Sequence, residues 1–149
     1  MTAATYLDTS GWLAVVSERD SRHAAAAEAY RTIIERGGLI VTSELMVAEM
    51  HFLTVRHRGT EAGIQLLEEL HRDPTHEIRY VDRELERQAI DRWLRPFPER
   101  TLSLADAVSF EIMRTEGIGT ALALDSRFRT AGFRTLPLPP EPQTDYVIA

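Results

Sequence analysis

Short apolar segments alternate with helical segments along this chain, and the alternation limits the possible folds more than any other feature. Helices are expected over 12–17, 21–36, 44–57, 59–70, 83–94 and 103–116, with a further turn of helix from Ser126. Strands are expected between them, at 5–7, 39–41, 77–81, 120–124 and 133–136. Strands separated by helices are typical of an α/β domain whose parallel sheet is covered on both faces. We therefore predict a three-layer α/β/α domain with a mostly parallel central sheet.

Length and composition suit one soluble domain. The 149 residues can bury one sizeable core, and a hydrophobic fraction of 44% is ordinary for a globular protein. No apolar run approaches the roughly 18 residues that a membrane span needs, and the first residues carry no basic segment of a signal peptide. The absence of cysteine removes disulfides and cysteine nucleophiles and suits a reducing cytoplasm. We expect a single domain over 1–149 in the cytoplasm, with a proline-rich tail from about residue 137.

Three aspartates stand where parallel sheets place their ligands. Asp8 and Asp125 each follow a predicted strand, and Asp106 lies in the first turn of a predicted helix. Ligands of such sheets gather beyond the carboxyl ends of the strands, so we expect these carboxylates to converge. Each also has a purely structural interpretation. Asp8 and Asp125 are suited to capping helices, and Ser103 with Asp106 resembles a capping box.

Glu49 is the fourth acidic candidate. Its predicted helix places it on one face with Leu45, Phe52 and Leu53, because these positions are three or four residues apart. A glutamate within an apolar stripe costs free energy to bury unless a positive charge meets it. The position therefore indicates a functional carboxylate, and an imperfect helix face is the alternative explanation.

Converging carboxylates require a cation, because they repel one another and raise each other's pKa values. Oxygen ligands without cysteine or a histidine pair select Mg²⁺ or Mn²⁺ rather than zinc. Such ions hold phosphates and activate water, which indicates metal-assisted phosphodiester hydrolysis.

The net charge of −6 first argues against a nucleic-acid partner. Without the four candidate acids the balance would be only −2, and all 17 basic residues are arginine, whose planar fork suits phosphate. Arg127, close behind Asp125, is the candidate for an RNA phosphate contact. The acidic balance is therefore compatible with an RNA substrate.

Four segments together resemble the PIN-domain family, and most closely its VapC-type ribonuclease toxins. They are YLDTS at 6–10, the helix carrying Glu49, LSLADA at 102–107 and LDSRF at 124–128. The resemblance covers nearly the whole chain in the family's motif order. It implies that Asp8, Glu49, Asp106 and Asp125 form the catalytic and metal-binding set.

Two neighbouring positions complete the resemblance. Ser10 matches the hydroxyl that orients the first acid in the family. Ala123 departs from the family pattern, because many members have threonine at this position. Without the threonine hydroxyl, Asp125 lacks one supporting hydrogen-bond partner.

The resemblance also implies a function and partners. It implies an Mg²⁺- or Mn²⁺-dependent endoribonuclease, the toxin of a type II toxin–antitoxin system, which uses metal-activated water and leaves a 5′-phosphate. The substrate would be a tRNA or rRNA, and the partners a small antitoxin and a second copy of the chain. Two alternatives stay open: a catalytically silent PIN-fold module that binds RNA or protein, and a different metal-dependent phosphohydrolase.

Overall fold

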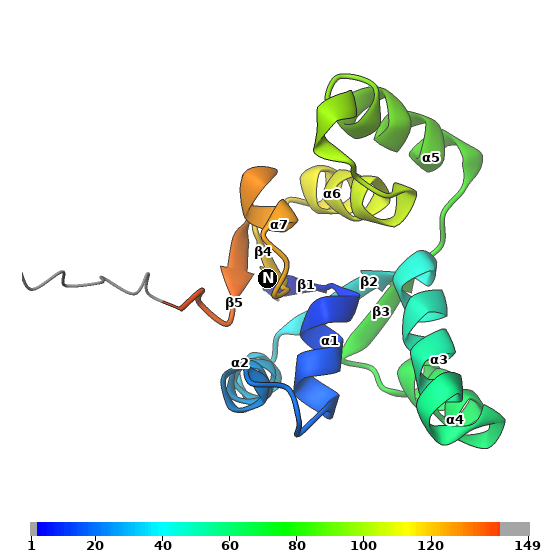
Figure 1. Cartoon of the computed structure of the whole chain (residues 1–149), viewed down its shortest axis with the longest axis vertical. Coiled ribbons are helices and arrows are strands. Elements are labelled where there is room, and N and C mark those ends of the chain that lie inside the picture. Colours follow the sequence, from blue (N-terminus) through cyan, green and yellow to red (C-terminus); the bar gives the residue numbers. More distant parts are fainter. Residues whose placement is uncertain (1–2, 141–149) are drawn as a thin grey trace, which may run out of the picture.

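The computed structural model describes residues 3–140, and five strands form the centre of this part of the chain (Figure 1). Their spatial order is β3-β2-β1-β4-β5, and every neighbouring pair is parallel. The strands are β1 (Ala4–Leu7), β2 (Leu39–Ser43), β3 (His76–Arg79), β4 (Thr120–Leu122) and β5 (Arg134–Leu136). The chain adds strands on one side of β1 and then on the other, so the strand order reverses between β1 and β4.

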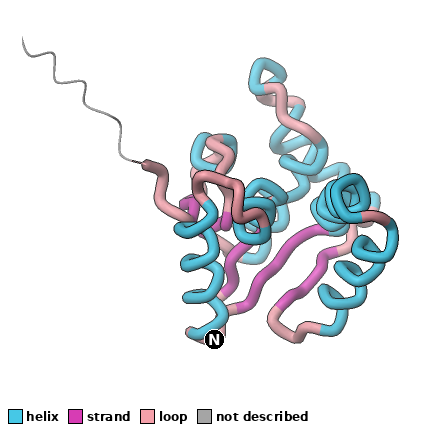
Figure 2. Tube along the Cα trace, turned by 60° about the horizontal axis from the view of Figure 1, so that its bottom comes forward, coloured by secondary structure: helices cyan, strands magenta, loops and turns pink. Residues whose placement is uncertain are grey.

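Helices cover both faces of the sheet, which confirms the predicted three-layer α/β/α architecture (Figures 1 and 2). One layer contains α1 (Thr9–Val16), α2 (His23–Glu35), α3 (Glu44–Arg58) and α4 (Thr60–Arg72). The other layer contains α5 (Arg83–Ala89), α6 (Leu104–Glu116) and α7 (Arg127–Thr130). A π-helical turn over Ile90–Leu94 continues α5, and a 3₁₀ turn spans Pro98–Arg100.

The pleat of the strands divides the core into two apolar clusters. Tyr6 and Val41 are paired in register and pack in the cluster on the α6 face. Leu7 and Ile40, their neighbours along the chain, pack in the cluster on the α3 face. Successive strand side chains point to opposite faces, so each central strand supplies both clusters. This two-sided burial explains why these segments read as continuous apolar runs.

The structure differs from the sequence expectations mainly at the ends of elements. The strand expected over 120–124 ends at Leu122, because the backbone N–H of Leu124 donates to the Ser10 hydroxyl at 3.0 Å instead of to a strand. The first helix begins at Thr9 rather than 12, because the Asp8 carboxylate caps it.

Two further expectations concern the proline-rich tail and membrane spans. Residues 137–140 of the expected proline-rich tail contain neither helix nor strand, and 141–149 lie outside the described residues. In the described part, no helix is both long and apolar enough to cross a membrane.

Gly11 allows α1 to lie directly against the end of β4. A Cβ atom at this position would be 2.0 Å from the carbonyl oxygen of Leu122, and that oxygen belongs to backbone that cannot rotate away. The absence of a side chain therefore brings the first turn of α1 and the carboxyl end of β4 together.

We expect Gly11→Ala to lower the free energy of unfolding by about 2–3 kcal/mol or more, because the new methyl group overpacks a backbone contact. Urea unfolding followed by circular dichroism would measure the change. Gly119→Ala is the matched control, since a Cβ there would meet nothing within 4 Å. Equal midpoints for Gly11→Ala and the wild type would show that this close contact is not required.

Candidate active site

Three of the expected carboxylates meet where the strand order reverses. Asp8 directly follows β1, Asp125 lies three residues after β4, and Asp106 stands in the first turn of α6. The carboxyl ends of β1 and β4 are adjacent, and ligands of parallel sheets bind at such a reversal. The topology therefore brings Asp8 together with two acids from the last third of the sequence.

Asp8 is buried and held in place by Ser10. Its side chain is 6% exposed and accepts from the backbone N–H of Ser10 at 3.1 Å and from the Ser10 hydroxyl. The same hydroxyl accepts from the backbone N–H of Leu124, so Ser10 connects the end of β1 to the loop that carries Asp125. Burial raises the pKa of Asp8, the hydrogen bonds from Ser10 lower it, and the charges of Asp106 and Asp125 raise it further. The net direction is upward.

Asp106 caps α6 and also contacts an arginine. Its backbone N–H donates to the Ser103 hydroxyl at 3.0 Å, and its carboxylate accepts from the backbone N–H of Ser103 at 3.1 Å. This reciprocal pair confirms the capping box at the start of α6. The Asp106 carboxylate, 4% exposed as a residue, also contacts Arg127.

Arg127 connects two of the acids. Its Nη1 donates to Oδ2 of Asp106 at 2.9 Å, and its Nε donates to Oδ2 of Asp125 at 2.8 Å. Its Nη2 and its backbone N–H also contact the Asp125 carboxylate. Although partial burial raises the pKa of Asp125, the hydrogen bonds and charge of Arg127 lower it below its usual value. One guanidinium therefore stands as a cation between two carboxylates.

Ala123 lies in the core beside Asp125. The residue is 1% exposed and packs in the cluster on the α6 face. It provides no hydroxyl to Asp125, and Arg127 provides backbone and side-chain hydrogen bonds in its place. The sequence placed Arg127 near the chemistry, but no pattern in the sequence indicated that it pairs with the acids.

Glu49 lies on an exposed part of α3. The expectation of an apolar stripe around it was wrong, because Phe52 on that face is 59% exposed. The helix instead buries the face that carries Met46, Val47 and Met50. Glu49 Oε2 accepts from the hydroxyl of Thr9 at 2.8 Å, and Thr9 is the neighbour of Asp8. Thr9 is thus a link between α3 and the aspartates that the sequence did not reveal.

The site contains oxygen donors suited to a hard divalent cation. In residues 3–140, no three acidic or histidine side chains are arranged as a ready set of ligands around one ion. The aspartates are nevertheless close enough for the charges of Asp106 and Asp125 to act on Asp8, and a cation, Arg127, already contacts two of them. The chemistry of these donors fits magnesium or manganese.

Comparisons with known proteins identify the family. The model of the PIN domain matches residues 5–134, and the chain therefore belongs to the PIN-domain family. The 23S rRNA-specific endonuclease VapC20 of Mycobacterium tuberculosis, in strains H37Rv and CDC 1551, is 32% identical over 128 residues, which are 86% of this chain and 94% of that protein. The crystal structure of the M. tuberculosis VapC20 toxin, described as cleaving the sarcin–ricin loop, has a TM-score of 0.75 and 31% identity, covering 87% of this chain and 95% of that one.

These similarities confirm the class that the sequence indicated. The family and the VapC toxin relatives confirm the PIN fold and the expectation of an RNA-cleaving hydrolase of the VapC type. The individual site residues, the metal ion and the partners stay predictions.

The buried charge of Asp8 gives a test of the acid cluster. We expect Asp8→Asn to raise the Tm by about 2–4 °C in neutral buffer with a chelator, because it removes a desolvated negative charge and keeps a good helix cap. The sign follows from linkage: a raised folded-state pKa means that ionisation at neutral pH costs stability, and the cost disappears as pH falls below that pKa.

Asp82→Asn is the matched control for this measurement. Asp82 is an exposed cap whose carboxylate accepts from the N–H of Leu85 at 2.8 Å. Its replacement should move the Tm by no more than about 1–2 °C. Equal changes in Tm for the two substitutions would mean that burial and the neighbouring acids do not make the Asp8 charge destabilising.

Proposed function

We propose that this chain is a divalent-metal-dependent endoribonuclease whose cation is held by Asp8, Asp106 and Asp125, with Glu49 completing the set from α3. The observation that carries the proposal is the Arg127 guanidinium, which contacts both Asp106 and Asp125 and so marks a position favourable to positive charge. The raised pKa of Asp8, caused by burial and then by its acidic neighbours, adds a reason for a cation at this point. Nucleases of the PIN family depend on divalent metal ions, and the donors here suit Mg²⁺ or Mn²⁺.

The protein's own groups have defined tasks in this proposal. The cation supplies Lewis acidity, which lowers the pKa of water and offsets the charge of the phosphate. Ser10 fixes the Asp8 carboxylate by a side-chain and a backbone hydrogen bond. Arg127 is 44% exposed, and its fork can turn from the acids to a phosphate of the RNA. Hydrolysis would leave the 5′-phosphate expected of the family.

The substrate that we propose is the sarcin–ricin loop of 23S rRNA. The support is the similarity to VapC20, which spans 86% of this chain at 32% identity. The related structure is described as a sarcin–ricin loop cleaving toxin. RNA of this kind is recognised through exposed loops rather than through its duplex.

A groove on the helical layer that contains α3 supports an antitoxin partner. It has a volume of 490 Å³ and lies between α1, α3 and α4. Leu13 and Val16 of α1 are 38% and 43% exposed there, and Leu53 follows Glu49 by one helical turn. Arg19 and Arg58 add positive charge. We propose that an amphipathic acidic segment of the antitoxin occupies it.

Three further expectations are proposed on the family resemblance. One PIN domain would account for the whole chain, two copies would form a homodimer, and the protein would act in the cytoplasm. The family match over residues 5–134 supports the first of these.

Cleavage of an RNA hairpin with the sarcin–ricin loop sequence tests the proposed activity. We expect cleavage with Mg²⁺ or Mn²⁺, none with EDTA, and a loss of about 100-fold or more for Asp106→Asn, which removes one ligand charge. Asp82→Asn should cleave like the wild type. Undiminished cleavage by Asp106→Asn would refute the site, and cleavage of other RNAs alone would refute only the substrate.

Arg127→Gln should lower both the Mn²⁺ concentration that cleavage requires and the maximal cleavage rate. The Mn²⁺ concentration for half-maximal cleavage should fall, because no guanidinium competes for Asp106 and Asp125. The rate at saturating Mn²⁺ should fall roughly tenfold or more, the worth of one hydrogen bond to a charged phosphate. Arg129→Gln is the control on the same helix, since Arg129 donates to Thr135 at 3.0 Å. An unchanged metal requirement would exclude the competition.

A further inference from the structure

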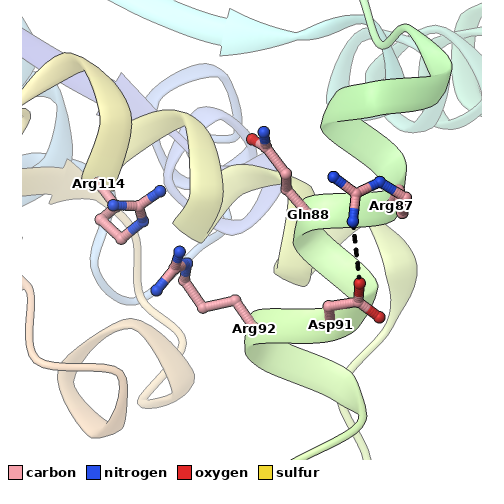
Figure 3. A pocket seen from close by; sticks show the side chains of 5 residues that line it. All are labelled: Arg87, Gln88, Asp91, Arg92 and Arg114. Atoms are coloured by element: carbon pink, nitrogen blue, oxygen red, sulfur yellow. Dashed lines mark hydrogen bonds and ion pairs between the residues drawn. The ribbon is translucent and has the colours of Figure 1, made fainter.

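A second charged cavity lies away from the acids, between the α5 segment and the second half of α6 (Figure 3). It has a volume of 390 Å³ and is lined by Arg87, Gln88, Asp91, Arg92 and Arg114. None of the four candidate acids lines it. Arg114 follows Asp106 by eight residues on α6, which is about 12 Å along the helix axis. Three arginines at one cavity stand out in a chain whose net charge is −6.

A single buried carboxylate organises two of these arginines. Glu111 is fully buried, and it accepts from Trp93 Nε1 at 2.9 Å and from Arg114 Nη2 at 2.6 Å. Arg92 Nε lies 3.2 Å from its Oε2. Burial raises the pKa of Glu111, but hydrogen bonds from Arg114 and Trp93 lower it by more. The net effect is a pKa below the usual value, and the carboxylate stays ionised. One negative charge thus faces two guanidinium groups.

The pairing leaves positive charge and hydrogen-bond donors at Arg92 and Arg114. Arg87, by contrast, pairs with Glu84 at 2.6 Å and with Asp91 at 3.3 Å. Within residues 3–140, both terminal nitrogens of Arg92 and Nη1 of Arg114 donate to no protein acceptor. The Arg92 and Arg114 side chains are 50% and 43% exposed. Glu111 therefore positions both guanidinium groups, and their remaining nitrogens are available to donate to a ligand.

We propose that Arg92 and Arg114 bind a backbone phosphate of the RNA substrate, at a distance from the scissile bond; this inference rests on the proposed ribonuclease function. Guanidinium forks bind phosphate oxygens in pairs, and Glu111 brings the two arginines to one cavity while its charge competes with a phosphate for them. All five side chains that line the cavity end in a polar or charged group, and three of them are arginines that can bind a phosphate. An RNA strand anchored near Asp106 can reach Arg114, about 12 Å further along the α6 axis, within a few nucleotides.

Salt-dependent RNA binding tests the proposal. The probe is a fluorescein-labelled hairpin with the sarcin–ricin loop sequence, followed by anisotropy in Mg²⁺ buffer, and every protein carries Asp106→Asn so that the RNA stays intact. We expect Arg92→Gln to weaken binding roughly fivefold and to reduce the slope of log affinity against log salt by about 0.7–0.9, the loss of one phosphate contact. Arg87→Gln, at the same cavity but paired with acids, should bind like the parent.

Glu111→Gln gives a result in the opposite direction. Glutamine keeps an acceptor for Trp93 and removes the charge that competes for Arg92 and Arg114. We expect RNA binding to tighten a few-fold and its salt dependence to steepen. A purely structural role of the arginines predicts no such gain. Circular dichroism on each variant checks that the fold is retained, and Arg92→Gln, at a half-exposed position, decides alone if Glu111→Gln unfolds.

The remaining outcomes separate this inference from the proposed function. Parent-like affinity and slope for Arg92→Gln would overturn the phosphate site and leave the ribonuclease proposal intact. Failure of the parent itself to bind the hairpin would contradict the proposed sarcin–ricin substrate. Poly-glutamate serves as a protein-like polyanion: if Arg92→Gln loses affinity for it but not for RNA, the cavity binds an acidic protein and the RNA assignment is wrong.

Discussion

The repulsion between Asp8, Asp106 and Asp125 is the constraint on which the rest of the site depends. Asp8 and Asp106 are almost fully buried, and negative charges in such surroundings destabilise a fold unless positive charge meets them. Arg127 supplies that charge to Asp106 and Asp125, while hydrogen bonds from Ser10 stabilise Asp8. A divalent cation would neutralise the same oxygens more completely. The electrostatic cost of the cluster and the cation that we propose there therefore have the same cause.

The fold maintains this cluster with ordinary structural devices. The Asp8 carboxylate caps α1, and Asp106 belongs to the capping box of α6. Gly11 lets α1 approach β4, and Ser10 then connects Asp8 to the backbone of Leu124. The sheet supplies the rest, because the reversal of strand order places the ends of β1 and β4 side by side. Structural capping is thus compatible with the metal-binding role that we propose for the same residues.

Local patterns in the sequence predicted the three layers and the convergence of the three aspartates. Strand ends, helix caps and the alternation of strands with helices are each encoded within a few residues. The local patterns failed where the outcome depends on distant partners. The apolar stripe around Glu49 does not exist, since α3 buries the face of Met46 and Met50 instead. The expected strand over 120–124 ends early because of a serine more than a hundred residues away. The contact of Arg127 with Asp106 was invisible for the same reason.

Isothermal titration calorimetry with Mn²⁺ tests the central claim most directly, because it measures cation binding without RNA or turnover. The account predicts one class of Mn²⁺ site on the wild type, and a clear loss of affinity for each of Asp8→Asn, Asp106→Asn and Asp125→Asn. Glu49→Gln should lose affinity as well if α3 completes the site through Thr9. Undiminished Mn²⁺ affinity in all of these variants would contradict the account, because the cation would then bind elsewhere.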